Sequence, residues 1–422
     1  MTTRQAKQGP WHTGKSATSV VVAMCLSLLV AACSSSSKSS TTTATSSTAA
    51  PATASATTAA PSGPPIKLMS ILDLSGGTGL VPQNEDGVLT AVAAINAAGG
   101  INGRPLQAII CDTKSDPNGA ASCAHQAVSD GVAALVGSET QLEANYLPII
   151  EQAGIANIGI VPIGAPAFTS STAFPLSSGT TASFSGQALE LVDQGATKIS
   201  LVAIDVPQAT AFAPVINIGL KSKNLQLSGT VLVPSPSPDM ASYVAAATRG
   251  GVNGIEVLLL SADAVKFVQA AHQAGVTAKI GMITQDPEGL IKALGPLADG
   301  IYMTSDSKLL AQTSDPAVAK YLADAKLAGK PASGRAMADG WAPVQLFQLA
   351  AKSATTIDAA GILAAMKALT NADVGVYPPI NYTQHITELP LTHIFNDKVV
   401  FAVVKNGQEV PLTGQFVNAF GQ

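Results

Sequence analysis

The 422-residue sequence lacks the features that would point to a nucleic-acid-binding protein, a membrane-spanning protein or a common class of enzyme. It contains no run of about 20 apolar residues, the length that a helix needs to cross a bilayer. It has no basic stripe and no block of like charge, and its formal net charge is −4, so we expect no nucleic acid partner. The motifs G-x-S-x-G and H-E-x-x-H are absent as well, and the pattern G-x-x-x-x-G-K-S/T occurs only at residues 9–16, ahead of the first apolar run rather than after a predicted strand. We therefore expect no enzyme, no cofactor and no metal.

The first 32 residues have the pattern of a secretory signal peptide. A basic start precedes the apolar run VVVAMCLSLLVAA (residues 20–32), which is too short to span a hydrocarbon core of about 30 Å. The run ends in LVAAC, which resembles the lipobox of bacterial lipoproteins, whose cysteine is lipidated and becomes the new amino terminus. We therefore expect residues 1–32 to be a signal peptide and Cys33 to be lipidated. A plain signal peptide with a chance cysteine is the alternative.

A segment of low complexity follows over residues 33–65. From Ser34 to Pro65 it contains one charged residue, Lys38, and consists almost entirely of Ser, Thr, Ala, Pro and Gly. Such a segment buries too little apolar surface to offset the entropy lost on ordering, so we expect a disordered tether. Lipid and tether together would hold a globular part, residues 66–422, at the outer face of a membrane.

Two cysteines, Cys111 and Cys123, remain in the globular part. In the oxidising compartment of a secreted protein, an even pair of cysteines commonly forms a disulfide. We expect a disulfide here, and two buried free thiols are the alternative. The spacing C-x11-C, without a nearby histidine, does not match a zinc site.

The globular part repeats one helix-to-strand connection, in which an alanine-rich helical pattern ends at glycine and a β-branched apolar run follows. AINAAGGINGRPLQAIICD (residues 94–112) is an example. Glycine after the last helical turn adopts the left-handed conformation that a Cβ disfavours. Short, continuous apolar strands are typical of parallel sheets covered by helices on both faces, so the predicted fold class is α/β.

The expected strands fall into two series. Strand starts are expected at residues 66, 105, 132 and 155, and again at 198, 226, 255 and 278. Each series suits one doubly wound parallel-sheet lobe. The carboxyl-terminal part predicts helices over 336–351 and 359–369, and then a β-hairpin over 399–412 around Asn406-Gly407.

Several blocks of this sequence resemble the type I periplasmic binding proteins, in the branch that binds leucine, isoleucine and valine. The resemblance is carried by AVAAINAAGGINGRPLQAIICDTKSDPNGAASCAHQAVSDGVAALVG, QAAHQAGVTAKIGMIT, ALGPLADGIYMTS, ADGWAPVQLFQLAA and VVFAVVKNG. It implies two lobes joined by three crossover segments, near 175–178, 302–306 and 375–380. The lobes would then comprise residues 66–176 plus 305–376 and residues 177–304 plus 377–422.

The resemblance also implies a ligand between the lobes, at the carboxyl ends of the strands, in agreement with the general rule for open α/β sheets. Loops at this edge expose backbone N–H groups at helix starts, which suit an anion such as a carboxylate. The expected ligand-binding residues lie in such loops of both lobes: Ser75, Ser138, Glu139, Thr140, Gln141, Gly164, Ala165, Asp205, Gln208 and Asp286.

Some of these residues also have a structural interpretation. Asp205 and Asp286 follow strands and would equally well cap the helices that begin there. Glu139 would repel a carboxylate, bind a cationic ligand or point to solvent. Trp341 is expected to pack within the protein rather than to line the cleft.

The sequence departs from the amino-acid binders of this family at the ligand site. Their two adjacent hydroxyl residues after the third strand correspond roughly to Thr140-Gln141, and their tyrosine in the second lobe is missing from DVPQAT. The acidic residues nearest to the position of their ammonium-binding carboxylate, Asp286 and Glu288, are displaced along the loop. The solute therefore stays open between an amino acid or close analogue, an amide, a small organic acid and another polar solute.

Together these observations predict a lipid-anchored extracytoplasmic solute-binding protein of an ABC importer. Its partners would be the solute, the permease subunits and, through the lipid alone, the membrane, and we expect a monomer. An extracytoplasmic sensor is the first alternative, because one fold serves both roles. A secreted hydrolase is the second.

Overall fold

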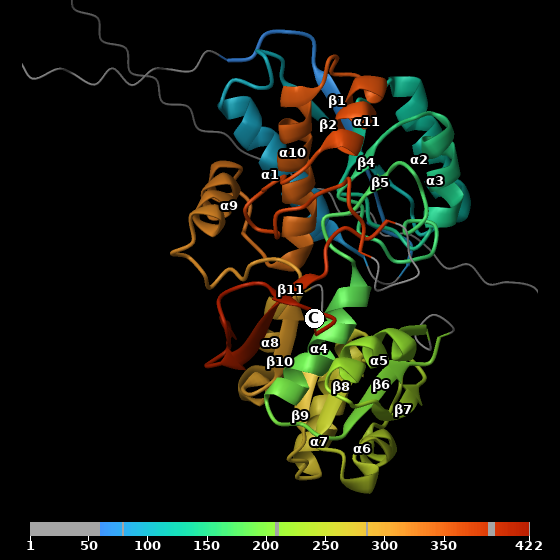
Figure 1. Cartoon of the computed structure of the whole chain (residues 1–422), viewed down its shortest axis with the longest axis vertical. Helices are drawn as coiled ribbons and strands as arrows, with labels where there is room; N and C mark the ends of the chain where they lie inside the picture. Colours follow the sequence, from blue (N-terminus) through green and yellow to red (C-terminus); the bar gives the residue numbers. More distant parts are fainter. Residues whose placement is uncertain (1–59, 78–79, 207–210, 284–285, 387–392, 422) are drawn as a thin grey trace, which may run out of the picture. The chain divides into compact units, whose positions relative to one another are not determined.

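The structure, a computed structural model, describes residues 60–77, 80–206, 211–283, 286–386 and 393–421 (Figure 1). The predicted signal peptide, Cys33 and most of the tether lie outside the described residues, so the predictions for them stay predictions. Within the described part of the chain, no helix combines the length and apolar character that a membrane span needs.

Two separate sheets organise the described residues, and the first has the strand order β2-β1-β3-β4-β5 with all neighbours parallel. Its strands are β1 (Ile66–Leu72), β2 (Leu106–Asp112), β3 (Ala134–Val136), β4 (Asn157–Ile158) and β5 (Ala173–Phe174). Its helices are α1 (Pro82–Ala97), α2 (Pro117–Asp130), α3 (Glu143–Gln152), α9 (Pro316–Leu327), α10 (Arg335–Ser353) and α11 (Ala359–Ala368). We call this part the first lobe.

The second sheet has the order β12-β11-β10-β9-β8-β6-β7, and β13 pairs with β11. β6 to β10 run parallel, whereas β11 is antiparallel to its neighbours. The strands are β6 (Ile199–Ile204), β7 (Leu227–Val233), β8 (Gly254–Leu258), β9 (Lys279–Met282), β10 (Tyr302–Ser305), β11 (Lys398–Lys405), β12 (Gln408–Pro411) and β13 (Val417–Asn418). The helices are α4 (Thr180–Asp193), α5 (Phe212–Ser222), α6 (Ala241–Ala247), α7 (Ser261–Gln273) and α8 (Pro287–Leu294). We call this part the second lobe.

The predicted α/β class is confirmed, and every expected strand begins within two residues of its expected start. The helix-to-strand connection after α2 also has the expected left-handed glycine. Gly131 ends α2 with a φ of 63°, and its N–H donates to the carbonyl oxygens of Ala127 and Val128. The chain can therefore leave the helix and enter β3 within three residues.

The first lobe depends on a close crossing of α1 and α10. A Cβ on Gly87 would lie 2.0 Å from the carbonyl oxygen of Met337, and a Cβ on Gly340 would lie 2.0 Å from that of Asn84. Real Cβ atoms do not approach other atoms so closely, so only glycine allows the two backbones to touch at these positions. The crossing holds the start of α10 against the start of α1, and both starts border the cleft described below.

The carboxyl-terminal elements match the predictions. α10 and α11 cover the two expected helices, and β11 and β12 form the expected hairpin. Asn406 and Gly407 join them with φ angles of 51° and 72°, as a tight two-residue hairpin turn requires. Trp341 is buried with its ring edge-on to Tyr321, so its predicted packing role is confirmed.

The predicted disulfide is also present. Cys111, on β2, and Cys123, on α2, are joined with their Cα atoms 5.8 Å apart. The alternative of two free thiols is therefore wrong. The bridge ties the edge strand of the first sheet to a helix that covers it.

Tyr377, Ile380 and Tyr382 pack in the same apolar core as β1, α1 and α10. These residues follow α11, and the chain then continues to β11 of the second lobe. The predicted residue boundaries of the two lobes stay predictions.

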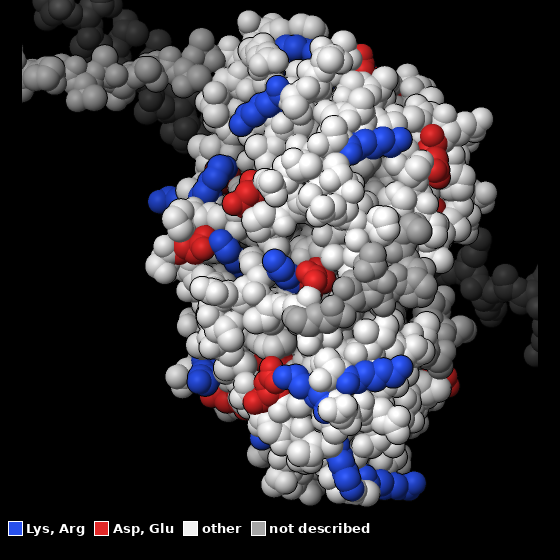
Figure 2. All heavy atoms as spheres, viewed as in Figure 1, with Lys and Arg blue, Asp and Glu red and all other residues white. Residues whose placement is uncertain are grey.

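Charged side chains are sparse on the face of the molecule that Figure 2 shows, where Lys and Arg alternate with Asp and Glu. Across the whole sequence, 12% of the residues are charged. This face therefore presents mainly uncharged groups to solvent.

Candidate functional site

A cleft of about 600 Å³ is lined by residues of both lobes. Asp73, after β1, and Glu139, after β3, contribute from the first lobe, and Leu260, after β8, and Asp286, after β9, contribute from the second. The carboxyl ends of parallel strands therefore meet here from two sheets, which is where open α/β folds bind their ligands. The starts of α1, α7 and α10 complete the wall through Pro82, Ser261 and Ala336.

Asp73 occupies the donors of the loop after β3. Its carboxylate accepts hydrogen bonds from the Thr140 hydroxyl at 2.8 Å and the Gln141 N–H at 3.4 Å. The Thr113 hydroxyl donates to it as well. These are the groups that would otherwise be available to an anionic ligand, so Asp73 satisfies from within the protein the donors predicted to meet a ligand.

Glu143, in the first turn of α3, plays the same part for the loop after β4. Its carboxylate accepts from the N–H groups of Ile163 at 2.8 Å, Gly164 at 2.9 Å and Ala167 at 3.4 Å. Burial raises the pKa of Glu143 to about 7, although the three backbone hydrogen bonds oppose the rise. A second internal carboxyl group therefore fills a nest of backbone donors beside the cleft.

Glu139 is held at the cleft by its own backbone. Its N–H donates to the carbonyl oxygen of Ile71, and its carbonyl oxygen accepts from the N–H of Asp73. Its carboxylate accepts from the Asn84 amide at 3.2 Å. Burial raises the pKa of Glu139, and the Asn84 hydrogen bond and the charge of Arg335 oppose that rise only in part.

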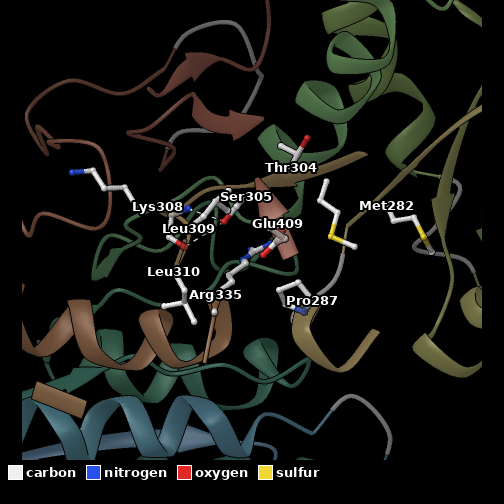
Figure 3. Close-up of a pocket in the computed structure, with 12 residues that line it drawn as sticks. Met282, Pro287, Thr304, Ser305, Lys308, Leu309, Leu310, Arg335 and Glu409 are labelled. Carbon is white, nitrogen blue, oxygen red and sulfur yellow. Dashed lines mark hydrogen bonds between the residues drawn. The ribbon is translucent and has the colours of Figure 1, made fainter. Parts of the chain in front are cut away.

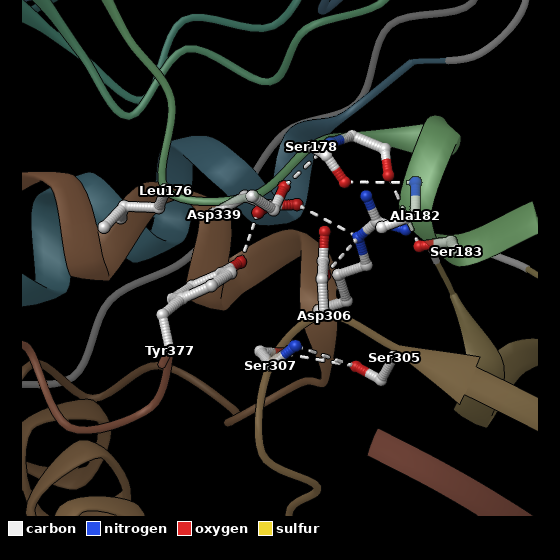
Figure 4. Close-up of polar contacts among 12 residues, drawn as sticks. Leu176, Ser178, Ala182, Ser183, Ser305, Asp306, Ser307, Asp339 and Tyr377 are labelled. Carbon is white, nitrogen blue, oxygen red and sulfur yellow. Dashed lines mark hydrogen bonds and ion pairs between the residues drawn. The ribbon is translucent and has the colours of Figure 1, made fainter. Parts of the chain in front are cut away.

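A buried polar cluster lies behind the cleft, where the chain passes between the lobes. The Arg335 Nε lies 3.0 Å from Asp306 Oδ1 and 3.6 Å from Asp339 Oδ2. The Tyr377 hydroxyl donates to Asp339, and Figure 4 shows Asp306, Asp339 and Tyr377 converging near Ser178. Burial raises the pKa of Asp339, and the charge of Arg335 opposes the rise. The cluster thus joins α10 to the segments around Asp306 and Tyr377, which lead from one lobe to the other.

A smaller cavity of about 20 Å³ adjoins this cluster, with room for about one water molecule. Figure 3 shows Met282, Thr304, Arg335 and Glu409 among the residues that line it. Burial raises the pKa of Glu409 to about 7, and the charge of Glu288 adds to the rise. The described residues contain no group of three or more His, Cys, Asp or Glu side chains placed to hold a metal ion.

Residues 65–408 match the family model described as periplasmic binding protein. The chain belongs to this family. The leucine-, isoleucine-, valine-, threonine- and alanine-binding protein of Pseudomonas aeruginosa is a relative, 44% identical over 64 residues. The match spans 14% of this periplasmic binding protein and 17% of the relative, so the chain covers about a sixth of that relative's length.

Solved structures with low sequence identity share the fold. A substrate-binding periplasmic protein from Ralstonia solanacearum is 18% identical with a TM-score of 0.69, over 82% of this chain and 99% of its own. An isoleucine-bound substrate-binding protein of the branched-chain amino acid transporter of Streptococcus pneumoniae is 19% identical with a TM-score of 0.68, over 84% and 99%. A fatty acid ABC transporter substrate-binding protein from Thermomonospora curvata is 18% identical with a TM-score of 0.67, over 82% and 91%. The predicted type I fold is confirmed.

In this periplasmic binding protein, four of the predicted ligand-binding residues line the cleft: Glu139, Thr140, Gln141 and Asp286. Asp286 also caps α8 by accepting from the Gly289 N–H at 3.0 Å, so its predicted capping role is confirmed. Gln208 lies outside the described residues.

The other predicted residues are not among the described residues that line the cleft: Ser75, Ser138, Gly164, Ala165 and Asp205. Ser138 is buried, and its Oγ accepts from the Ile71 N–H at 3.2 Å. Ser75 is exposed and donates through its hydroxyl to Asp112 at 2.5 Å. Ser138 and Ser75 thus already have hydrogen-bond partners within their own lobe. Contact of any of these five residues with a ligand stays a prediction.

Sequence reasoning missed the apolar part of the wall and the role of Glu143. Leu80, Val81, Leu259 and Ile283 line the cleft, whereas the residues predicted from these loops are polar or small. Their place next to strand ends or a helix start was a usable signal. Glu143 gave no such signal, because an acidic residue in a first helical turn is common on any helix.

Proposed function

We propose that this protein is a lipid-anchored extracytoplasmic solute-binding protein of an ABC importer. In this proposal the two lobes close on a small polar solute and deliver it unaltered to a permease. The observation that carries the proposal is the cleft of about 600 Å³ at the carboxyl ends of strands from two separate sheets. Clefts of this size and position are typical of small-molecule sites. Membership of the family and the amino-acid-binding relative from P. aeruginosa support it.

Closure would follow from simultaneous contact with both lobes. A solute that touched only one lobe would bind the open and closed forms equally and would shift no equilibrium. Here Glu139 faces the cleft from one lobe and Asp286 from the other, so one solute would be able to bridge them. The chain segments around Asp306 and Tyr377 would then act as the hinge.

Calorimetric titration of the purified protein against amino acids, amines, amides, organic acids and sugars tests this function. We expect one class to bind and to reduce the radius of gyration measured by X-ray scattering. Leu260→Arg should weaken that binding at least tenfold, because it places bulk and charge in the cleft. Leu327→Arg, at another exposed leucine on α9, is the matched control. Failure of the whole panel to bind would contradict the proposal, and hydrolysis of an ester or amide would favour the hydrolase.

The proposed anchor has its own test. Cys33→Ser should release the protein from the membrane fraction into the medium or periplasm, because the acyl chains that hold it are attached to this thiol. Cys25→Ser, within the same leader, is the matched control and should leave the protein on the membrane. Retention of the Cys33→Ser protein on the membrane would show that another feature anchors it.

Importer and sensor roles differ in what happens when the protein is missing. An importer component is required for uptake of its solute, so cells without this protein should fail to accumulate the labelled solute. Unchanged uptake together with a lost transcriptional response would favour the sensor.

A further inference from the structure

All ionisable side chains among the described residues that line the cleft are acidic. Asp73 and Glu139 contribute carboxyl groups from the first lobe and Asp286 from the second, and no Lys, Arg or His is among the described residues that line it. Residues 78–79, 207–210 and 284–285, whose positions are outside the described residues, contain no charged residue in the sequence. A negative potential between low-dielectric walls attracts a cation and repels a carboxylate.

The donors that a carboxylate would need in the first lobe are already used. Asp73 takes the Thr140 hydroxyl and the Gln141 N–H, and Glu143 takes the N–H groups of Ile163 and Gly164. A ligand carboxylate would have to displace one of these internal carboxyl groups. The first helical position of α1 is Pro82, which has no N–H to offer.

The second lobe offers donors of a different kind. Asp286 caps α8, so that helix start already faces a carboxylate. α7 begins at Ser261 without a side-chain cap, but Asp263 lies in its first turn, where its charge offsets the positive end of the helix. The backbone N–H groups there suit a carbonyl or hydroxyl oxygen of a solute. This end of the cleft therefore accommodates a neutral polar group next to the acidic wall.

Arg335 does not supply the missing positive charge. Its guanidinium is 4% exposed and forms ion pairs with Asp306 and Asp339. It borders the small cavity of about 20 Å³, and the neighbouring residue, Ala336, is the one that faces the cleft. Arg335 is thus neutralised by carboxylates behind the wall.

Part of the remaining wall is apolar, on both sides of the cleft. Leu80 and Leu260 come from opposite lobes and are 41% and 42% exposed. Val81, Leu259 and Ile283 extend the apolar surface. Covering such side chains contributes roughly 25 cal/mol for each Å² removed from water, so an aliphatic group on the solute would add to binding.

We propose that the cleft selects an organic cation, a small aliphatic solute that carries an ammonium group and no free carboxylate. This inference rests on the proposed solute-binding function and names its solute class. The ammonium group lies between the carboxyl groups of the two lobes, and the aliphatic part lies against Leu80 and Leu260.

Four probes that share one branched skeleton test the inference by calorimetric titration of the purified full-length protein. They are 3-methylbutylamine, leucinamide, leucine and 4-methylpentanoate. We expect the amine and the amide to bind at least tenfold more tightly than leucine, and 4-methylpentanoate to give no heat of binding. Binding of the cations should weaken at high salt, because the attraction is screened.

Asp286→Asn is the matched variant, because asparagine keeps the cap on α8 and removes the charge. It should weaken binding of the amine at least fivefold while leaving the melting temperature near that of the wild type. Asp193→Asn, at an exposed carboxylate outside the cleft, is the control and should leave binding unchanged. Equal affinity of Asp286→Asn and the wild type would overturn the proposal.

Different results would overturn the cation proposal and the underlying proposal of solute binding. Tighter binding of leucine or 4-methylpentanoate than of leucinamide overturns the cation proposal and leaves solute binding in place. Binding of uncharged solutes alone does the same. Failure of every solute in the wider panel overturns both.

Discussion

At the scale of single residues, Glu143 shows burial and hydrogen bonding acting in opposite directions on one carboxyl group. The side chain is 2% exposed, and burial raises its pKa to about 7 against the hydrogen bonds from three backbone N–H groups. Because the folded-state pKa lies above the usual 4.5, the folded protein holds this proton more tightly than the unfolded chain does. The stabilising contribution is present below pH 4.5 and is lost as the pH rises through about 7.

Glu143→Gln should remove this pH dependence. The free energy of unfolding of the wild type relative to the variant should fall by about 2.5 kcal/mol between pH 5 and pH 8, from the relation between pKa shift and stability. Urea unfolding at several pH values measures it. Glu151→Gln is the control, because hydrogen bonds from Ser171 hold the pKa of Glu151 below its usual value, outside this range. A constant difference between wild type and Glu143→Gln across the range would contradict the assignment.

At the scale of elements, the α1–α10 crossing shows that a helical sequence pattern does not determine how two helices pack against each other. The sequence predicts a helix that ends at Gly99-Gly100 and another over residues 336–351, and both are confirmed. It does not show that Gly87 and Gly340 face each other's helix, because that depends on how two segments about 250 residues apart cross. The sequence likewise does not predict β5, a two-residue strand that pairs with β4.

Gly87→Ala tests the crossing. Alanine favours a helix over glycine by about 1 kcal/mol, so an unconstrained site would gain stability. Here the added Cβ would lie 2.0 Å from the Met337 carbonyl oxygen, and we expect a net loss of about 2 kcal/mol in unfolding free energy, as for other overpacked core sites. Gly229→Ala in β7 is the control, because an added Cβ there meets nothing within 4 Å. A stabilised Gly87→Ala protein would show that the helices are not in contact there.

At the scale of the whole molecule, the cluster around Arg335 connects α10 with the segments that lead between the lobes. Arg335 has two carboxylate partners, Asp306 and Asp339, and Tyr377 donates to the second. Burial lowers the pKa of Arg335, but the charges of Asp306 and Asp339 more than offset this and raise it overall. Loss of any one member of a buried cluster of this kind destabilises the folded protein, because the remaining charged or polar groups would be left without compensation.

Tyr377→Phe should destabilise the protein by roughly 1–3 kcal/mol, because it leaves the buried Asp339 carboxyl group without its hydroxyl donor. Tyr382→Phe is the comparison, because its hydroxyl donates to the neutral carbonyl oxygens of Phe174 and Pro175. We expect a smaller loss there, about 1 kcal/mol. Chemical unfolding of both variants gives the two values, and an equal or smaller loss for Tyr377→Phe would show that the cluster does not depend on the Tyr377–Asp339 hydrogen bond.

The sequence by itself determined the α/β class, the positions of the eight strands expected in two series, the carboxyl-terminal hairpin and the pairing of Cys111 with Cys123. These features follow from local patterns, such as apolar runs, glycine after helices and turn residues, or from the pairing of two available thiols. Only the tertiary structure decided which groups face the cleft and which donors are already used. Glu143 accepts hydrogen bonds from the backbone of a loop about 20 residues away, and Arg335 pairs with Asp306 of a separate segment. Folding alone brings these groups together.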